Sequence, residues 1–188
     1  MKLFAETKKE NSTEYTIPMG KVNFLAFLFL LPILGLFLFP FIFLWDFSSI
    51  KEGYRFLLKN IIFIILGGVV LHELLHGITW AIFTKNGFKQ IKFGVNWKYL
   101  TPYTHFKKPI KIKFYLLGAL MPLLIMGILP TIVGIISGNG FYLLFGIFFT
   151  WAAAGDIIAS IRLFRLPMNL LVQDHPDTLG FIIYSKAT

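Results

Sequence analysis

Four long apolar runs divide this chain, and they constrain its fold more than any other feature. They cover residues 22–44, about 56–83, about 114–136 and about 141–161. Each run is long enough to cross a bilayer as a helix, which takes roughly 20 residues. In hydrocarbon the backbone must satisfy its own hydrogen bonds, so helices are the expected form. We therefore predict an all-α polytopic membrane protein with four transmembrane helices.

The composition agrees with a membrane protein and excludes several kinds of site. Hydrophobic residues make up 56% of the chain and charged residues only 14%, unlike a soluble globular domain. The absence of Cys excludes disulfides and thiolate metal sites. The net charge of +9 comes from basic residues between the apolar runs. We therefore expect anionic lipid headgroups as partners and no nucleic acid.

The distribution of basic residues predicts the topology. The segment between the second and third runs, residues 84–113, holds eight Lys, and both terminal segments are also basic. The positive-inside rule then places these segments and both termini in the cytoplasm. We expect a cytoplasmic N-terminal segment over 1–21, a four-helix transmembrane domain over 22–161 and a cytoplasmic tail over 162–188.

The second run carries ionisable residues in the order His72-Glu73-Leu-Leu-His76. Residues four apart share one face of a helix, so His72 and His76 can hold one metal ion between them. Glu73 lies to the side, where it can reach a water on that metal. This is the H-E-x-x-H pattern of zinc hydrolases, with Glu73 as the general base. A charge near mid-membrane costs roughly 2.5–3.5 kcal/mol, which favours a metal site over an accidental match.

Asp156 is the expected third metal ligand, because it lies at the same membrane depth as His76. The second and fourth helices both run toward the cytoplasm, and the two residues lie roughly 10 Å and 8 Å from that surface. Glu73 and Asp156 are the only acidic residues within the four runs. Water would take the fourth zinc position. The alternatives that stay open are a pairing of Asp156 with Arg162 and a ligand from His105 or His175.

Residues 91–99 alternate between apolar and polar side chains, a period of two. This pattern predicts a short cytoplasmic β-hairpin over about 88–106, between the second and third helices. Such a hairpin can hold an extended substrate by strand addition or lie on the membrane surface without a substrate role. Both interpretations stay open. Asn96, Tyr103 and His105 are candidate substrate-binding residues, and with Thr79 they are candidates for lining a polar opening.

The chain resembles a family of small prokaryotic membrane zincin peptidases, related to the site-2 intramembrane zinc metalloproteases. The matching pieces are His72-Glu-Leu-Leu-His76-Gly77, Pro102-Tyr103-Thr-His105, Gly118-Ala-Leu-Met-Pro122, Ala154-Gly155-Asp156 and Asp174-His175-Pro176. The resemblance implies zinc on His72, His76 and Asp156, in an integral protein of the prokaryotic plasma membrane. The chain departs from typical site-2 proteases because no Asn-Pro element accompanies Asp156. The group that stabilises the oxyanion therefore stays unassigned.

Together these features predict an intramembrane zinc metalloprotease, with residues 22–161 as its metalloprotease-like domain. It would hydrolyse peptide bonds of membrane-embedded protein or peptide substrates near the cytoplasmic face. Glu73 would take a proton from water and pass it to the leaving amine. The alternative hypothesis is a non-catalytic protein, either a metal-binding membrane scaffold or a degenerate protease homologue. Metal binding without cleavage would favour that alternative.

Overall fold

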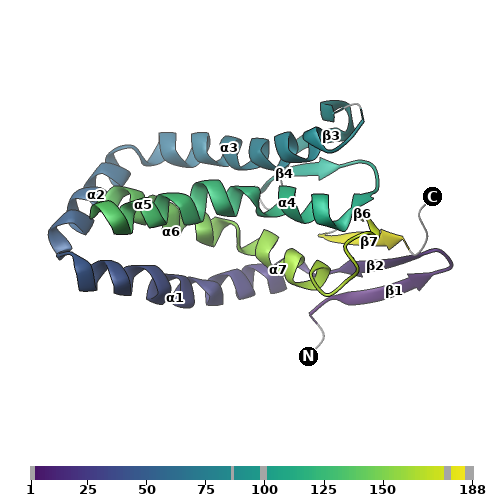
Figure 1. Cartoon of the computed structure of the whole chain (residues 1–188), viewed down its shortest axis with the longest axis horizontal. Coiled ribbons are helices and arrows are strands. Elements are labelled where there is room, and N and C mark those ends of the chain that lie inside the picture. The colour runs from purple at the N-terminus through teal and green to yellow at the C-terminus, as the bar shows by residue number, and fades with distance from the viewer. Residues whose placement is uncertain (1–2, 86, 98–100, 176–178, 185–188) are drawn as a thin grey trace. The chain divides into compact units, whose positions relative to one another are not determined.

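The computed structural model describes residues 3–85, 87–97, 101–175 and 179–184. Most of its elements are labelled in Figure 1. The α-helices are α1 (Met19–Leu44), α2 (Phe47–Lys59), α3 (Ile61–Ile82), α4 (Ile112–Pro122), α5 (Leu129–Ser137), α6 (Gly140–Ala152) and α7 (Ala154–Leu163). A 3₁₀ helix covers Gly87–Gln90, and a π-helical segment, Leu123–Ile128, joins α4 to α5. The third predicted span is therefore one continuous helical stretch, Ile112–Ser137, with a π-helical segment near its middle.

The strands form two antiparallel sheets, so the prediction of an all-α protein is wrong. The strands are β1 (Ala5–Lys9), β2 (Ser12–Thr16), β3 (Ile91–Asn96), β4 (Thr101–Phe106), β5 (Ile110–Lys111), β6 (Leu171–Asp174) and β7 (Gly180–Tyr184). One sheet has the order β1-β2-β7-β6-β5. It pairs the two terminal segments, with Thr16 opposite Gly180. These pairings join distant parts of the chain, so local periodicity did not indicate them.

The second sheet is the hairpin of β3 and β4, which lies within the segment 88–106 where the alternation predicts one. Ile91 is opposite Phe106, and Asn96 is opposite Thr101. Residues 98–100 of this segment lie outside the described residues, as does Pro176 of the resemblance motif.

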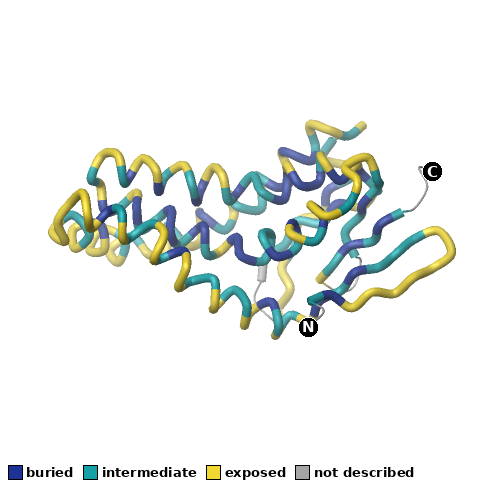
Figure 2. The backbone as a smooth tube through the Cα atoms, turned by 60° about the horizontal axis from the view of Figure 1, so that its bottom comes forward, coloured by how far each residue is buried: buried dark blue, intermediate teal, exposed yellow. Residues whose placement is uncertain are grey.

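Three helical stretches are long and apolar enough to cross a membrane within the described ranges. They are Met19–Leu44, Ile61–Ile82 and Ile112–Ser137. The expected fourth span is not one straight helix, because α6 and α7 meet at an angle of 52°. The four-helix prediction therefore holds only if this bent pair counts as one span. Along α1 only Val22, Ile33 and Phe41 are buried (Figure 2), which leaves an apolar surface of the kind that lipid covers.

The connector expected after the first span is a helix. Asp46 caps α2, and its Oδ1 accepts the backbone N–H of Ser48 at 2.9 Å. Hydrophobic and charged residues segregate to opposite faces of α2, as in helices that lie along a membrane interface. α2 runs through Lys59, so the second span begins at Ile61 rather than near Phe56.

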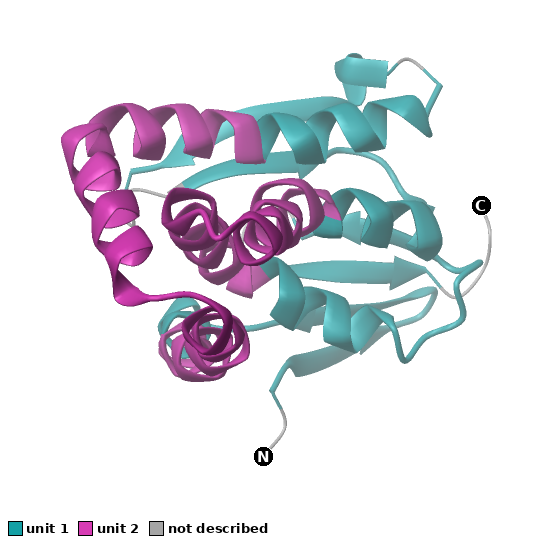
Figure 3. Ribbon diagram, turned by 60° about the vertical axis from the view of Figure 1, so that its left-hand side comes forward, with its two compact units in different colours: residues 1–23, 73–120, 156–188 teal, residues 24–72, 121–155 magenta. Residues whose placement is uncertain are grey.

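The chain divides into two compact units, which are coloured separately in Figure 3. One unit comprises residues 24–72 and 121–155, and its core packs Ile33 and Phe41 against Leu143 and Ile147. The other unit comprises residues 1–23, 73–120 and 156–188, and it contains both sheets. The division falls between His72 and Glu73, inside the continuous helix α3.

Candidate metal centre

His76 lies on the second half of α3, where the helix becomes buried. Its side chain is 6% exposed, and its Nδ1 atom is 2.8 Å from the carbonyl oxygen of Gly118 on α4. A carbonyl oxygen only accepts hydrogen bonds, so Nδ1 must carry the ring proton. The other ring nitrogen, Nε2, then has an unprotonated lone pair in the neutral imidazole. This is the arrangement in which a second group orients a metal-binding histidine.

Asp156 faces that second nitrogen from the first turn of α7. Its Oδ1 atom is 3.6 Å from His76 Nε2. Two ligand atoms at zinc distances in a tetrahedral site lie ~3.3 Å apart. The observed separation is thus close to that of two atoms sharing one ion, and slightly too long for a direct hydrogen bond. The nitrogen and carboxylate donors fit zinc.

His72 completes a group of three possible ligands. It lies one turn before His76 on α3, and each of His72, His76 and Asp156 offers one ligand atom within 4.8 Å of the others. The structure therefore brings together the three residues that the sequence nominates. With three protein ligands, a tetrahedral zinc site keeps one position for water or substrate, which is typical of catalytic rather than structural zinc.

Glu73 contacts the β3–β4 hairpin through Thr104. The Thr104 hydroxyl oxygen is 2.7 Å from Glu73 Oε2 and 2.9 Å from the Glu73 backbone oxygen. A hydroxyl has one proton, so it is shared between these two acceptors. The contact fixes the carboxylate of the predicted base to β4. Sequence reasoning missed Thr104, although alternation along β4 places it on the same face as the buried Phe106.

The ring of His76 packs at one end of a stack of aromatic rings. Trp80 follows one turn later on α3, and its ring stacks on that of His76 with centroids 5.5 Å apart. On its other side, the Trp80 ring stacks on Tyr115 with centroids 5.2 Å apart. Trp80 Nε1 also donates a hydrogen bond to the Tyr115 carbonyl oxygen at 3.0 Å. Gly118 leaves room for this ring, because a Cβ there would lie 2.1 Å from Trp80 Nε1. Gly118 thus both accepts the hydrogen bond of His76 Nδ1 and leaves space for Trp80.

Gly77 allows the hairpin to approach α3 closely. A Cβ on Gly77 would lie 2.5 Å from the ring of Phe93 on β3. Phe93 is the register partner of Thr104, and cross-strand partners lie on the same face of a sheet. The glycine after the second histidine therefore lets the face of the hairpin that carries Thr104 reach Glu73.

A buried carboxylate on β6 holds the end of β4. Asp174 Oδ2 accepts the backbone N–H of Phe106 at 2.7 Å, and Oδ1 accepts the hydroxyl of Tyr115. His105 Nδ1 lies 3.8 Å from Oδ2. Burial raises the pKa of Asp174 above its ordinary value, although these donors and His105 act in the opposite direction. Asp174 was quoted in the sequence resemblance without a role, and here it ties β4 to α4.

The candidate substrate-binding residues lie on the hairpin face opposite Thr104. Tyr103 covers Gly94 across the hairpin, Asn96 is exposed at the end of β3, and His105 contacts Asp174. Their roles stay predictions. Thr79, expected to line a polar opening, is buried and donates its hydroxyl proton to the Leu75 carbonyl at 2.7 Å. This hydrogen bond lies within α3, since Leu75 and Thr79 both belong to that helix.

Comparison with known protein families adds one finding. A family model described as "Putative zincin peptidase" matches residues 65–171, more than half of the chain. The matched part contains the His-Glu-Leu-Leu-His sequence of α3 and Asp156 of α7. No curated protein and no solved structure matches the chain.

Proposed function

The chain belongs to this zincin peptidase family, and from that premise we propose that it is an intramembrane zinc metallopeptidase of the site-2 type. Its substrates are membrane-embedded proteins or peptides, cut near the cytoplasmic face. The observation that carries the proposal is the 3.6 Å separation of His76 Nε2 and Asp156 Oδ1. One atom belongs to a candidate span, α3, and the other to α7 of the bent pair. Ionisable groups on such helices are costly without a function.

His72, His76 and Asp156 would hold the zinc ion. When bound there, zinc supplies a Lewis acid that polarises a carbonyl and lowers the pKa of water toward neutrality. The His76 ring is kept in the correct tautomer by the Gly118 carbonyl and in the correct plane by Trp80. The carboxylate of Asp156 adds a negative charge that offsets part of the charge of the cation.

Glu73 acts as the general base. It takes the proton of the attacking water at its carboxylate and delivers that proton to the leaving amine. The Thr104 hydroxyl bonds to Oε2 and occupies one of the lone pairs of the carboxylate, so that others stay available for proton transfer. Because the same hydroxyl also lies 2.9 Å from the Glu73 backbone oxygen, the carboxylate is held at a fixed position relative to its own helix.

Strand β4 presents an edge to which an extended substrate can add. The Phe106 N–H points to Asp174, away from β3, whereas the Lys107 N–H bonds to Gln90 on the β3 side. Successive residues direct their backbone groups to alternate sides, so those of Thr104 also point away from β3. Among the described strands, β4 pairs only with β3. A substrate peptide bonded to Thr104 would be extended beside Glu73, as hydrolysis of a helical segment requires.

Basic residues indicate the side of the membrane on which the site opens. The chain between α3 and α4 is rich in Lys, and it contains the hairpin that carries Thr104. By the positive-inside rule this segment and both termini face the cytoplasm. Anionic lipid headgroups on that surface are the expected non-substrate partners.

Metal content and cleavage test the proposal together. Full-length protein purified in detergent should contain zinc, and His76→Ala or Asp156→Ala should lose it. The matched controls are His105→Ala and His175→Ala, which remove the rival ligands and should keep it. Full zinc in both His76→Ala and Asp156→Ala would refute the ligand set.

Cleavage is then measured in proteoliposomes with synthetic transmembrane peptides carrying Gly near their cytoplasmic end, where they unwind more easily. Wild type should cut these peptides. Glu73→Gln should keep its zinc and leave them intact. A zinc-loaded wild type that cuts none of them would favour the non-catalytic alternative.

A further inference from the structure

A cleft of about 470 Å³ lies beside the terminal sheet, and His72, His76 and Asp156 are not among its described lining residues. Its lining combines apolar and charged side chains from the start of the chain and the end of α7. The lining includes Phe4, Glu6, Tyr15, Ile161, Arg162 and Arg165. All of them belong to the same compact unit.

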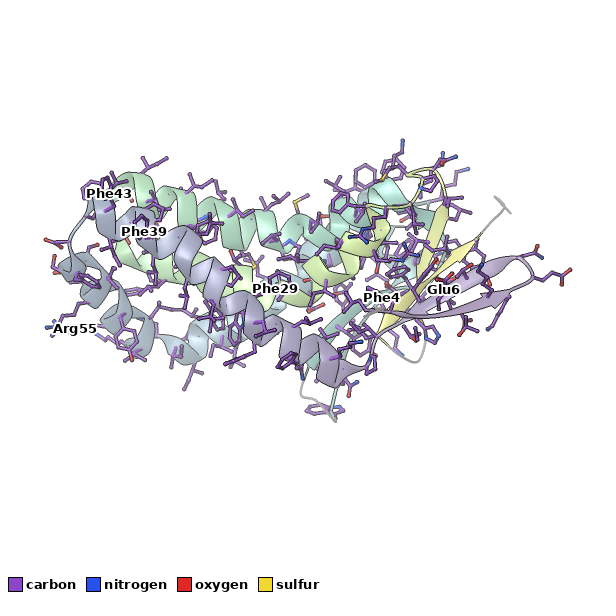
Figure 4. All side chains as sticks on the ribbon, turned by 90° about the horizontal axis from the view of Figure 1, so that it is seen from below. Phe4, Glu6, Phe29, Phe39, Phe43 and Arg55 are labelled. Atoms are coloured by element: carbon purple, nitrogen blue, oxygen red, sulfur yellow. The ribbon has the colours of Figure 1, made fainter. Side chains whose placement is uncertain are left out.

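Two buried aromatic residues line the cleft. Phe4 and Tyr15 are buried, and their rings lie 5.6 Å and 5.4 Å from the ring of Phe181 on β7. Glu6 is the register partner of Tyr15, and cross-strand partners share one face of a sheet. Phe4 and Glu6 are both labelled in Figure 4. The cleft thus uses one face of the sheet, which the pairing of β2 with β7 holds in place.

Two arginines give the cleft a positive charge. Arg162 Nη2 donates to the Tyr15 hydroxyl at 3.0 Å, and its guanidinium carbon lies 4.5 Å from the centre of the Tyr15 ring. A guanidinium has five N–H donors, and this bond uses one of them. Arg165 follows one turn later and is exposed. Glu6 is the single acidic residue among the described residues of the lining, and these residues together carry one net positive charge.

The position of the cleft suits an amphiphile rather than a water-soluble anion. α1, a candidate span, begins at Met19, four residues after Tyr15, and α7 closes the bent pair that can form another span. Ile161 and Phe164 are 41% and 55% exposed beside the arginines. Exposed apolar groups next to cationic ones match a lipid at the membrane interface, where basic pockets hold headgroups.

We propose that this cleft binds an acidic glycerophospholipid, with its phosphodiester on Arg162 and Arg165 and an acyl chain along Ile161. The single negative charge of a phosphodiester complements the one net positive charge of the lining. Guanidinium groups form bidentate hydrogen bonds with phosphate oxygens. The bound lipid would tie the terminal sheet to the membrane surface.

The test measures which lipids stay on the full-length protein. Protein in mixed micelles with equal phosphatidylglycerol and phosphatidylcholine is analysed by native mass spectrometry. Wild type should retain phosphatidylglycerol preferentially. Arg165→Gln should lower that preference about fivefold, the effect of one basic residue near an anionic surface. Glu6→Gln should raise it. Arg165 is chosen because Arg162 also supports Tyr15, and its loss can perturb the fold.

Two further measurements can refute the proposal. Lys111→Gln removes one exposed positive charge on β5, at the opposite edge of the same sheet, and should leave the preference unchanged. An equal loss in Lys111→Gln and Arg165→Gln would show general surface attraction and refute a specific site. Displacement of the lipid by millimolar inorganic phosphate would identify a phosphate site rather than a lipid site. Equal retention of both lipids by wild type would also refute the proposal.

Discussion

The Nδ1 atom of His76 donates a hydrogen bond of 2.8 Å to the carbonyl oxygen of Gly118. This bond joins α3 to α4 and determines which ring nitrogen faces Asp156. Partners of this kind orient metal-binding histidines, and their loss typically lowers metal affinity 10- to 100-fold. Because Gly118 also leaves space for Trp80, one residue supports His76 in two ways.

Replacing Gly118 by Ala should disturb the metal centre without touching a ligand. The new Cβ would lie 2.1 Å from Trp80 Nε1, and Trp80 is held between His76 and Tyr115. The ring therefore has to shift, and overpacking of this kind costs ~1–3 kcal/mol. We expect Gly118→Ala to lower the melting temperature and to weaken zinc binding by roughly tenfold or more, measured by competition with a zinc indicator.

Gly67→Ala is the matched control, because it lies on α3 with nothing within 4 Å of its Cβ position. It should keep wild-type zinc affinity and stability, or gain slightly from better helix propensity. Wild-type zinc affinity in Gly118→Ala would show that His76 does not depend on Trp80.

Thr104→Val should reduce turnover while leaving zinc bound. Valine has nearly the same shape but lacks the hydroxyl that lies 2.7 Å from Glu73 Oε2. Hydrogen bonds to charged groups are worth ~1.5–3 kcal/mol, so the cleavage rate should fall roughly 10- to 100-fold. Thr104→Ser keeps the hydroxyl and should stay near wild type. If Thr104→Val cleaved substrate as fast as wild type, Thr104 would not be needed to orient Glu73.

Removing zinc should destabilise the protein through the same three ligands. A ligand that binds only the folded state stabilises it by ~2.7 kcal/mol at 100 times its Kd. For a chain of this size that corresponds to a shift on the order of 5–10 °C in melting temperature. We expect a chelator to lower the Tm and added zinc to restore it.

Asp156→Asn should show almost no shift with zinc, because it loses the charged ligand. The control is Asp46→Asn, which changes an exposed carboxylate at the start of α2 and should respond like wild type. A full zinc shift in Asp156→Asn would place the metal elsewhere.

The sequence predicted those features that depend on local spacing. Run length located three apolar helices but not the bend in the fourth run, and a period of two located the β3–β4 hairpin. The four-residue spacing of His72 and His76 and the matching depth of Asp156 nominated a group that the structure brings within 4.8 Å. Each inference needed only helix or strand geometry.

Features that depend on distant pairings were missed. The terminal segments look like polar tails, yet Glu14 pairs with Ile182 in the larger sheet. No Pro marks the bend at Ala153, and Gly155 beside it was not interpreted as a helix break. Thr104 lies in the predicted hairpin, but its contact with Glu73 was not predicted. The side facing α3 depends on the close approach at Gly77, which only tertiary packing reveals.

The buried carboxyl of Asp174 should make stability depend on pH. Burial raises its pKa above 3.8, so the folded protein binds this proton more tightly than the unfolded chain does. The contribution to the free energy of unfolding is therefore complete below pH 3.8 and is lost as pH rises through the higher pKa of the folded state. Asp174→Asn cannot titrate and should lack this decline. Phe106 and Tyr115 donate to different oxygens of Asp174, and the amide NH2 of Asn replaces one of these acceptors, which should cost ~1–3 kcal/mol.

The stability advantage of wild type over Asp174→Asn should therefore shrink as pH rises, measured by thermal unfolding in detergent from acid to neutral pH. Asp46 provides a control of opposite sign. Hydrogen bonds from Ser48 lower the pKa of Asp46, so its contribution is present above pH 3.8 and is lost as pH falls through the lower pKa of the folded state. The advantage of wild type over Asp46→Asn should grow with pH. The two stability differences, wild type minus Asp174→Asn and wild type minus Asp46→Asn, should thus change with pH in opposite directions. If both changed in the same direction, the loss of one negative charge would explain them, and the opposite pKa shifts of the two carboxyls would be refuted.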